Sequence, residues 1–103
     1  MQMLMHVRFP IEPFNTAVRE GNAGQKIQRI MEAVKPAAAY FNASGGRRGG
    51  ILVVNLDDPS DIPRLAEPFF LTFNAEVSFE PFMTADDLGR SGLDSLAKEW
   101  GQD

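Results

Sequence analysis

The chain has 103 residues, of which 44% are hydrophobic and 23% are charged, and these values are typical of one globular domain with a single core. A net charge of -4, with Arg47-Arg48 as the one local cationic pair, argues against a nucleic-acid partner, and no run of about 20 apolar residues predicts a membrane span. The absence of cysteine excludes disulfides and thiolate chemistry, so any reaction would have to use oxygen and nitrogen groups.

The first predicted element is a strand over residues 2–9, in which the side chains alternate between two faces. One face is apolar and the other is mixed: Met3, Met5, Val7 and Phe9 lie on the first, and Gln2, Leu4, His6 and Arg8 on the second. Because a signal peptide would be continuously apolar here, a cytoplasmic location is expected. Pro10 and Pro13 end the strand.

A helix is predicted to begin with Asn15 as its N-cap and to run to about Val34, before Pro36. Gly21 and Gly24 weaken its first half, since glycine costs about 1 kcal/mol relative to alanine inside a helix. Either the helix bends there, or its backbone approaches the sheet too closely for a side chain.

A second strand is predicted over residues 37–43, and a third over residues 51–56, where a β-branched run indicates an extended chain. The glycine-rich stretch between them, residues 44–50, predicts a flexible hairpin loop. It does not have the G-x-x-x-x-G-K-[ST] spacing of a phosphate-binding loop, so no phosphate site is predicted there.

A short helix is predicted over residues 61–70, capped by Asp58 or Ser60 and kinked or ended by Pro68. The aspartates around its start suit turns and caps and do not follow a calcium-loop pattern, so no metal site is predicted. Alternating side chains over residues 73–82 predict the fourth strand.

Residues 84–103 are predicted to form a C-terminal helical arm, opened by a capping box of Thr84 and Asp87. Its apolar positions are Leu88, Leu93, Leu96 and Trp100. Such a stripe could pack on its own chain, pack on a neighbouring subunit, or bind another partner. The sequence leaves these three alternatives open.

The order of elements is the split β-α-β-β-α-β arrangement of ferredoxin-like domains, an α+β sandwich with both helices on one face of a four-stranded antiparallel sheet. Right-handed crossovers predict the spatial strand order four, one, three, two. The ferredoxin-like domain is expected to span residues 1–83, ahead of the arm. The residues predicted to face the helices are the apolar set of the first strand with Ala37, Ala39, Phe41, Leu52, Val54, Leu56, Phe73, Val77 and Phe79.

The opposite face of the sheet is predicted to be partly apolar and partly polar. Its apolar members are Leu4, Ile51, Val53 and Phe82, and its polar members are His6, Arg8, Tyr40, Asn42, Asn55, Glu76, Ser78 and Glu80. A face of this kind is commonly covered by a second copy through a twofold interface, so a homodimer is predicted. Two sheets stacked in this way would enclose a pocket.

Pairing of the first and fourth strands would bring His6 and Arg8 beside Glu76, Ser78 and Glu80. A histidine beside a carboxylate can move a proton at neutral pH, and an arginine can hold a carboxylate or enolate oxygen. The alternative is that these groups form ion pairs and hydrogen bonds that align the dimer.

Three short segments resemble the dimeric α/β-barrel superfamily: Met3-Leu4-Met5-His6-Val7-Arg8, Val54-Asn55-Leu56-Asp57-Asp58-Pro59, and Glu76-Val77-Ser78-Phe79-Glu80-Pro81-Phe82. Within this superfamily the chain is similar to muconolactone isomerase-like proteins and uncharacterised domains of similar length, over about residues 3–83. The resemblance implies a dimer whose two sheets enclose a barrel-like cavity, as in the superfamily's isomerases and cofactor-free monooxygenases. His6 and Arg8 match the first-strand pattern.

The resulting hypothesis is a small-molecule-binding protein, or an isomerase or lyase that uses neither cofactor nor metal. His6 would act as acid or base, with Glu76 or Glu80 as its partner, and Arg8 would bind an anionic group. The residues expected to line the ligand site are Tyr40, Asn42, Asn55 and Ser78. The competing hypothesis is a non-catalytic dimeric accessory or ligand-sensing module, in which the same residues specify assembly.

Overall fold

The computed structural model describes residues 1–101 and shows an α+β fold with a four-stranded antiparallel sheet. The strands are β1 (Gln2–Arg8), β2 (Ala38–Asn42), β3 (Gly49–Asn55) and β4 (Glu76–Pro81). The helices are α1 (Ile11–Glu20), α2 (Ala23–Val34), α3 (Ile62–Phe73), α4 (Ala85–Gly89) and α5 (Leu93–Trp100), with short 3-10 turns η1 (Ser44–Gly46) and η2 (Pro59–Asp61). The sheet order β2-β3-β1-β4 is the predicted order.

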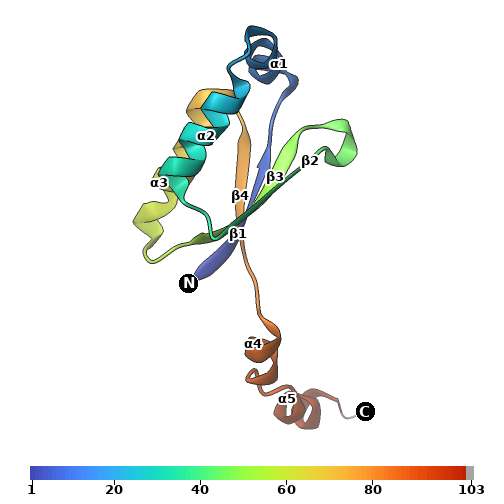
Figure 1. The fold of residues 1–103 in the computed structure, drawn as a ribbon. Coiled ribbons are helices and arrows are strands. Elements are labelled where there is room, and N and C mark those ends of the chain that lie inside the picture. Colours follow the sequence, from blue (N-terminus) through green and yellow to red (C-terminus); the bar gives the residue numbers. More distant parts are fainter. Residues whose placement is uncertain (102–103) are drawn as a thin grey trace.

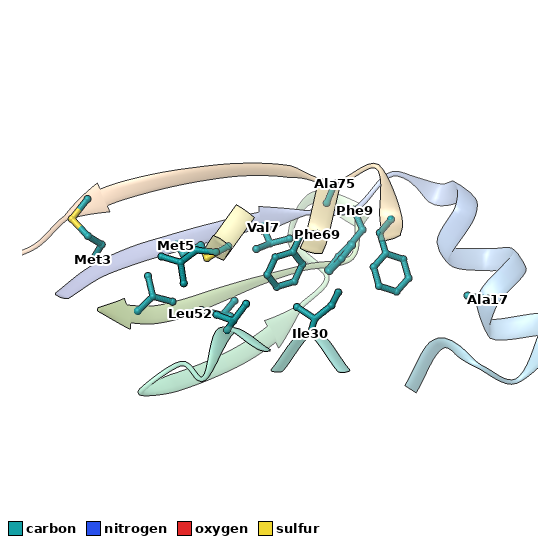
Figure 2. Close-up of a cluster of buried hydrophobic side chains, with 13 residues drawn as sticks. Met3, Met5, Val7, Phe9, Ala17, Ile30, Leu52, Phe69 and Ala75 are labelled. Carbon is teal, nitrogen blue, oxygen red and sulfur yellow. The ribbon is translucent and has the colours of Figure 1, made fainter. Parts of the chain in front are cut away.

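One face of the sheet is covered by helices and forms the core. Figure 1 shows α2 and α3 side by side along this face. The fully buried side chains come from the two inner strands and from α3, and Figure 2 shows most of them in one cluster: Met5, Val7, Leu52, Val54, Leu65, Phe69 and Phe73. The predicted alternation of β1 and β3 is therefore confirmed, because every second residue of these strands meets the helices.

The first predicted helix is two helices, because the chain turns at Gly21. Gly21 has a φ of 78°, the left-handed conformation that ends α1, and α2 begins at Ala23. A Cβ built on Gly24 meets nothing within 4 Å, so a close approach to the sheet does not explain that glycine. Asn15 is not an N-cap: it lies inside α1, and its Oδ1 accepts a 2.7 Å hydrogen bond from Arg48 Nη1.

The glycine-rich hairpin is shorter than predicted, because Gly49 and Gly50 are buried residues of β3. A Cβ on Gly49 would lie 2.8 Å from the carbonyl oxygen of Val7, and one on Gly50 would lie 3.1 Å from that of Tyr40. The neighbouring strands leave no room for a Cβ at Gly49, and they would have to move slightly to accept one at Gly50. These glycines therefore allow close strand pairing and do not belong to a flexible loop.

The outer strand β2 is less buried than predicted. Phe41, which was expected in the core, is 50% exposed, and Ala37 precedes the strand and is also exposed. Ala39 is the member of this predicted set that packs against the core. Since β2 lies at the edge of the sheet, its side chains have strand neighbours on one flank only.

Helix α3 is longer than predicted and contains Pro68 in its interior. Proline removes one helical N–H group, but Leu65, Phe69 and Phe73 on the same helix are buried in the core and hold this segment in place. Phe73 therefore ends a helix, whereas it was predicted to start the fourth strand, which begins at Glu76.

Two of the predicted caps are present, Asp58 at the start of η2 and Thr84 at the start of α4. Asp58 Oδ1 accepts a 2.9 Å hydrogen bond from the backbone N–H of Ser60. At the arm, Thr84 Oγ1 accepts from the N–H of Asp87 at 3.1 Å, and Asp87 Oδ2 accepts from the N–H of Thr84 at 3.0 Å. These bonds satisfy amide groups that a helix start leaves without partners.

The C-terminal arm consists of α4 and α5 and stands apart from the rest of the chain. Neither helix has a buried residue, and Figure 1 shows the arm projecting from the end of β4, away from the sheet and its helices. The predicted arm extended to residue 103, and its last two residues, 102 and 103, lie outside the described part of the chain.

Candidate functional site

The candidate site lies on the sheet face opposite the helices, and the strand register defines its layout. In the register of β1 with β4, Leu4 lies opposite Glu80, His6 opposite Ser78, and Arg8 opposite Glu76. The polar side chains of β1 and β4 that were predicted to meet therefore occupy neighbouring positions on one face. A further step across β3 connects this group with β2.

The closest polar contact on this face joins His6 and Glu80. His6 Nε2 and Glu80 Oε1 are 3.0 Å apart, and the two residues are diagonal neighbours across the β1–β4 pair. Their side chains are 39% and 61% exposed, so both are open to a ligand that approaches this face. Of the two glutamates considered as partners of His6, Glu80 is the one that contacts it.

Arg8 points toward the hairpin and not toward β4. Its Nη2 donates a 3.3 Å hydrogen bond to the carbonyl oxygen of Ser44 in η1. Although Glu76 lies opposite Arg8 in the register, the two side chains form no ion pair in the described structure. Most of the guanidinium donors of Arg8 are therefore without a protein partner within residues 1–101.

His6 and Arg8 together line two shallow hollows on this face. The first has a volume of about 130 Å³ and lies toward the hairpin. The second has a volume of about 190 Å³ and lies toward β4. The polar residues that complete the first are Asn42, Ser44 and Arg47, and those that complete the second are Glu76 and Ser78.

Arg47 is a member of the site that the sequence reasoning missed. It lines the first hollow together with Arg8, and no carboxylate side chain lines that hollow, whereas Glu76 lines the other one. The signal was present in the sequence as the cationic pair of Arg47 and Arg48, but a loop residue has no register that would place it beside a strand. The first hollow is thus the more cationic of the two.

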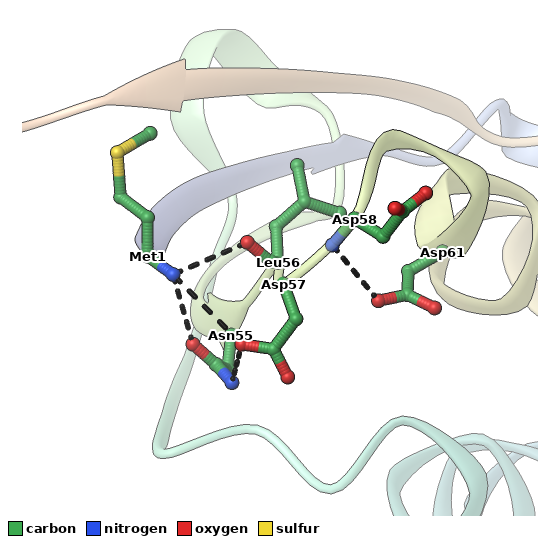
Figure 3. Close-up of polar contacts among 6 residues, drawn as sticks. All are labelled: Met1, Asn55, Leu56, Asp57, Asp58 and Asp61. Atoms are coloured by element: carbon green, nitrogen blue, oxygen red, sulfur yellow. Dashed lines mark hydrogen bonds and ion pairs between the residues drawn. The ribbon is translucent and has the colours of Figure 1, made fainter.

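Of the remaining predicted residues, two lie at or near this site and one, Asn55, lies at the end of β3 away from it. Asn42 lines the first hollow, and Tyr40, which is 69% exposed, lies on β2 in line with Ile51 and His6. Asn55 does not join them. Figure 3 shows that its side chain accepts a hydrogen bond from the amine of Met1 at 3.3 Å and donates one to Asp57 at 2.9 Å.

Comparison of the sequence with models of known protein families gives no match, and neither does comparison with curated proteins. Among residues 1–101, no three histidine, aspartate or glutamate side chains are grouped so that they could hold a metal ion. Within that same part of the chain, no helix is both long enough and apolar enough to cross a membrane.

Proposed function

We propose that this chain forms a homodimer of the dimeric α/β-barrel type through the open face of its ferredoxin-like sheet, and that the enclosed space binds a small organic anion and moves a proton on it. The observation that carries the proposal is the 3.0 Å contact between His6 and Glu80, made beside a hollow that Arg8 and Arg47 line. An acid or base and an anion clamp thus adjoin each other on one exposed face.

The proposed dimer interface is supported by the apolar part of this face. Leu4, Ile51 and Val53 are each partly exposed on the two inner strands. A second sheet stacked on them would remove apolar surface from water, which is favourable by about 25 cal/mol per Å². It would also exclude water from the polar group and strengthen its electrostatic interactions.

The proposed chemistry follows from the atoms of His6 that remain available. When Nε2 carries the ring proton and donates a hydrogen bond to Glu80, Nδ1 is the free basic nitrogen. Nδ1 would take a proton from a carbon next to a carboxylate or carbonyl group, while Arg8 and Arg47 stabilise the negative charge that develops on oxygen. The proton on Nδ1 exchanges with solvent, and delivery of a proton from Nδ1 to a different carbon completes an isomerisation without any redox partner.

The proposal can be tested with the ring signals of His6, because the chain has one histidine. We expect muconolactone to shift these NMR signals with saturation, and adipate, a saturated dicarboxylate, to compete for the same site. In D₂O, the bound lactone should exchange a carbon-bound proton for deuterium. Arg8→Gln should weaken binding by about tenfold or more, since one charge-assisted hydrogen bond contributes about 1.5–3 kcal/mol.

His6→Gln separates binding from chemistry. It should retain binding and lose the exchange of deuterium, because the base is removed while both arginines remain. Binding without any exchange in the natural chain would instead support the ligand-sensing module. A monomer in sedimentation analysis whose His6 signals do not respond to either acid would refute the proposal.

A further inference from the structure

A wide apolar groove lies on the other side of the molecule, between α2 and α3. It has a volume of about 590 Å³. Ile30 and Ala33 line it from α2, and Pro68 and Leu71 line it from α3. Leu71 is 80% exposed, although it is a large apolar side chain. The groove therefore presents apolar surface that the chain itself does not cover.

The rim of this groove is cationic. Lys26 and Arg29 of α2 and Arg64 of α3 line it, with Glu67 as the single acidic member of the lining. None of the three cations forms an ion pair in the described part of the chain. With Glu67 counted, the lining still has a net positive charge in a chain whose net charge is -4, and this favours an acidic occupant.

The C-terminal arm has the complementary properties. Along α5, Leu93, Leu96 and Trp100 follow one another at helical spacing of three and four residues, which places them on one face. They are 54%, 46% and 77% exposed. The same helix carries Asp94, Glu99 and one cation, Lys98, and none of the three forms an ion pair within residues 1–101. The arm thus combines an apolar stripe with a net negative charge.

We infer that the arm of one copy docks into the α2–α3 groove of a second copy. The leucines and Trp100 of α5 would cover Pro68 and Leu71, and Asp94 and Glu99 would face the cationic rim. A second copy is favoured over the arm's own groove, because the arm leaves β4 in the direction away from the sheet and its helices (Figure 1). This inference is independent of the ligand site on the opposite sheet face.

Charge reversal on each side of the contact provides the test. The groove variant carries Arg29→Glu and Arg64→Glu, and the arm variant carries Asp94→Lys and Glu99→Lys. All four residues are exposed, so the fold should tolerate the changes. Each variant alone faces like charges, which should weaken docking by at least about tenfold. In an equimolar mixture, a mixed dimer has opposite charges at both contacts. The acidic arm of the groove variant meets the cationic groove of the arm variant, and the basic arm of the arm variant meets the acidic groove of the groove variant.

Trp100 is the single tryptophan and reports docking directly. We expect its fluorescence emission to lie at shorter wavelength in the natural chain, at longer wavelength in each variant alone, and again at shorter wavelength in the mixture. Sedimentation should show weaker association for each variant alone than for the natural chain, and recovery of that association in the equimolar mixture. The matched control, Arg19→Glu with Lys35→Glu, makes the same charge change outside the groove and should leave the emission unchanged.

Two results would overturn the inference. If the arm folds onto its own groove, both variants lose docking and the mixture does not recover it. If the emission of Trp100 is the same in all samples, the arm does not use this groove. A dimer formed by the sheet face would persist in the groove variant, so failure of arm docking is distinguishable from failure of the proposed function.

Discussion

At the scale of single residues, two glutamates of β4 lie near His6, one on each side of Ser78, which is opposite His6. The structure shows which of the two contacts the histidine. Glu80 contacts His6 Nε2 at 3.0 Å, whereas Glu76 lies opposite Arg8. A carboxylate that holds one ring nitrogen fixes the tautomer and orients the other nitrogen toward the ligand. Glu80 is therefore a positioning residue for the proposed base.

We expect Glu80→Gln to slow deuterium exchange on bound muconolactone by about 10- to 100-fold, the usual effect of losing a partner that orients a functional histidine. The affinity for adipate should change little, because Arg8 and Arg47 remain. Glu76→Gln is the matched control and should leave the exchange rate within about twofold of the natural chain. Equal losses in the two variants would contradict this assignment.

At the scale of elements, the same substitution of glycine by alanine should have opposite effects on stability at two positions. A Cβ at Gly49 would lie 2.8 Å from the carbonyl oxygen of Val7 and push β3 away from β1. A Cβ at Gly24, near the start of α2, meets no atom within 4 Å. Gly49→Ala should therefore destabilise the fold, by about 1–3 kcal/mol. Gly24→Ala should stabilise it by up to about 1 kcal/mol.

Urea unfolding followed by circular dichroism measures both changes. The double variant should show the sum of the two effects within about 0.5 kcal/mol, because the two glycines share no partner. If Gly49→Ala has no effect on the unfolding midpoint, the strands can separate at that position and the close approach is not a constraint.

The cap at the start of η2 links the stability of the helical layer to pH. The hydrogen bonds that Ser60 donates from its hydroxyl and its backbone N–H lower the pKa of Asp58 below its usual value of 3.8. A carboxylate with a lowered pKa in the folded state stabilises that state above its unfolded pKa. This contribution is lost as the pH falls through the lower, folded-state pKa.

We therefore expect the urea midpoint of the natural chain to fall as the pH is lowered from about 5 toward 3. Asp58→Asn should show a smaller dependence over the same interval, since it removes the titrating group while keeping an acceptor for Ser60. The difference between the two curves isolates Asp58 from the other carboxyl groups. Parallel curves would show that this cap does not contribute.

Local patterns in the sequence were sufficient for some elements and not for others. The alternation of β1, the β-branched run of β3 and the capping box at Thr84 each depend on neighbouring residues, and each is present as predicted. The assignment of Phe73 to a strand and of Gly49 to a loop failed. In both cases burial against distant segments decides the structure, and that information is not local.

The same distinction applies to the candidate site. The proximity of His6 and Glu80 follows from strand pairing, which sequence reasoning can anticipate. The place of Arg47 depends on how the hairpin turns back over the sheet, and Asn55 is held by the amine of Met1. The α2–α3 groove combines residues from two helices far apart in the sequence, so no local pattern predicts it.

At the scale of the whole molecule, the chain is far more extended than its length requires. The radius of gyration is 17.8 Å and the longest extent is 61 Å, whereas a compact chain of this length has a radius of gyration of about 13 Å. The projecting arm accounts for the difference (Figure 1). The proposed sheet interface and the proposed arm contact lie on opposite faces, so they can form independently.

Two single substitutions separate these contacts. Val53→Lys places a charge on the open sheet face, and Leu71→Lys places one in the groove; both side chains are at least partly exposed. We expect each single variant to keep one association in sedimentation analysis, and the double variant to be a monomer. X-ray scattering of that monomer should give a radius of gyration near 17.8 Å, because the arm then has no partner. A double variant that still dimerises would reveal a further interface, with the unpaired edges of β2 and β4 as the next surfaces to test.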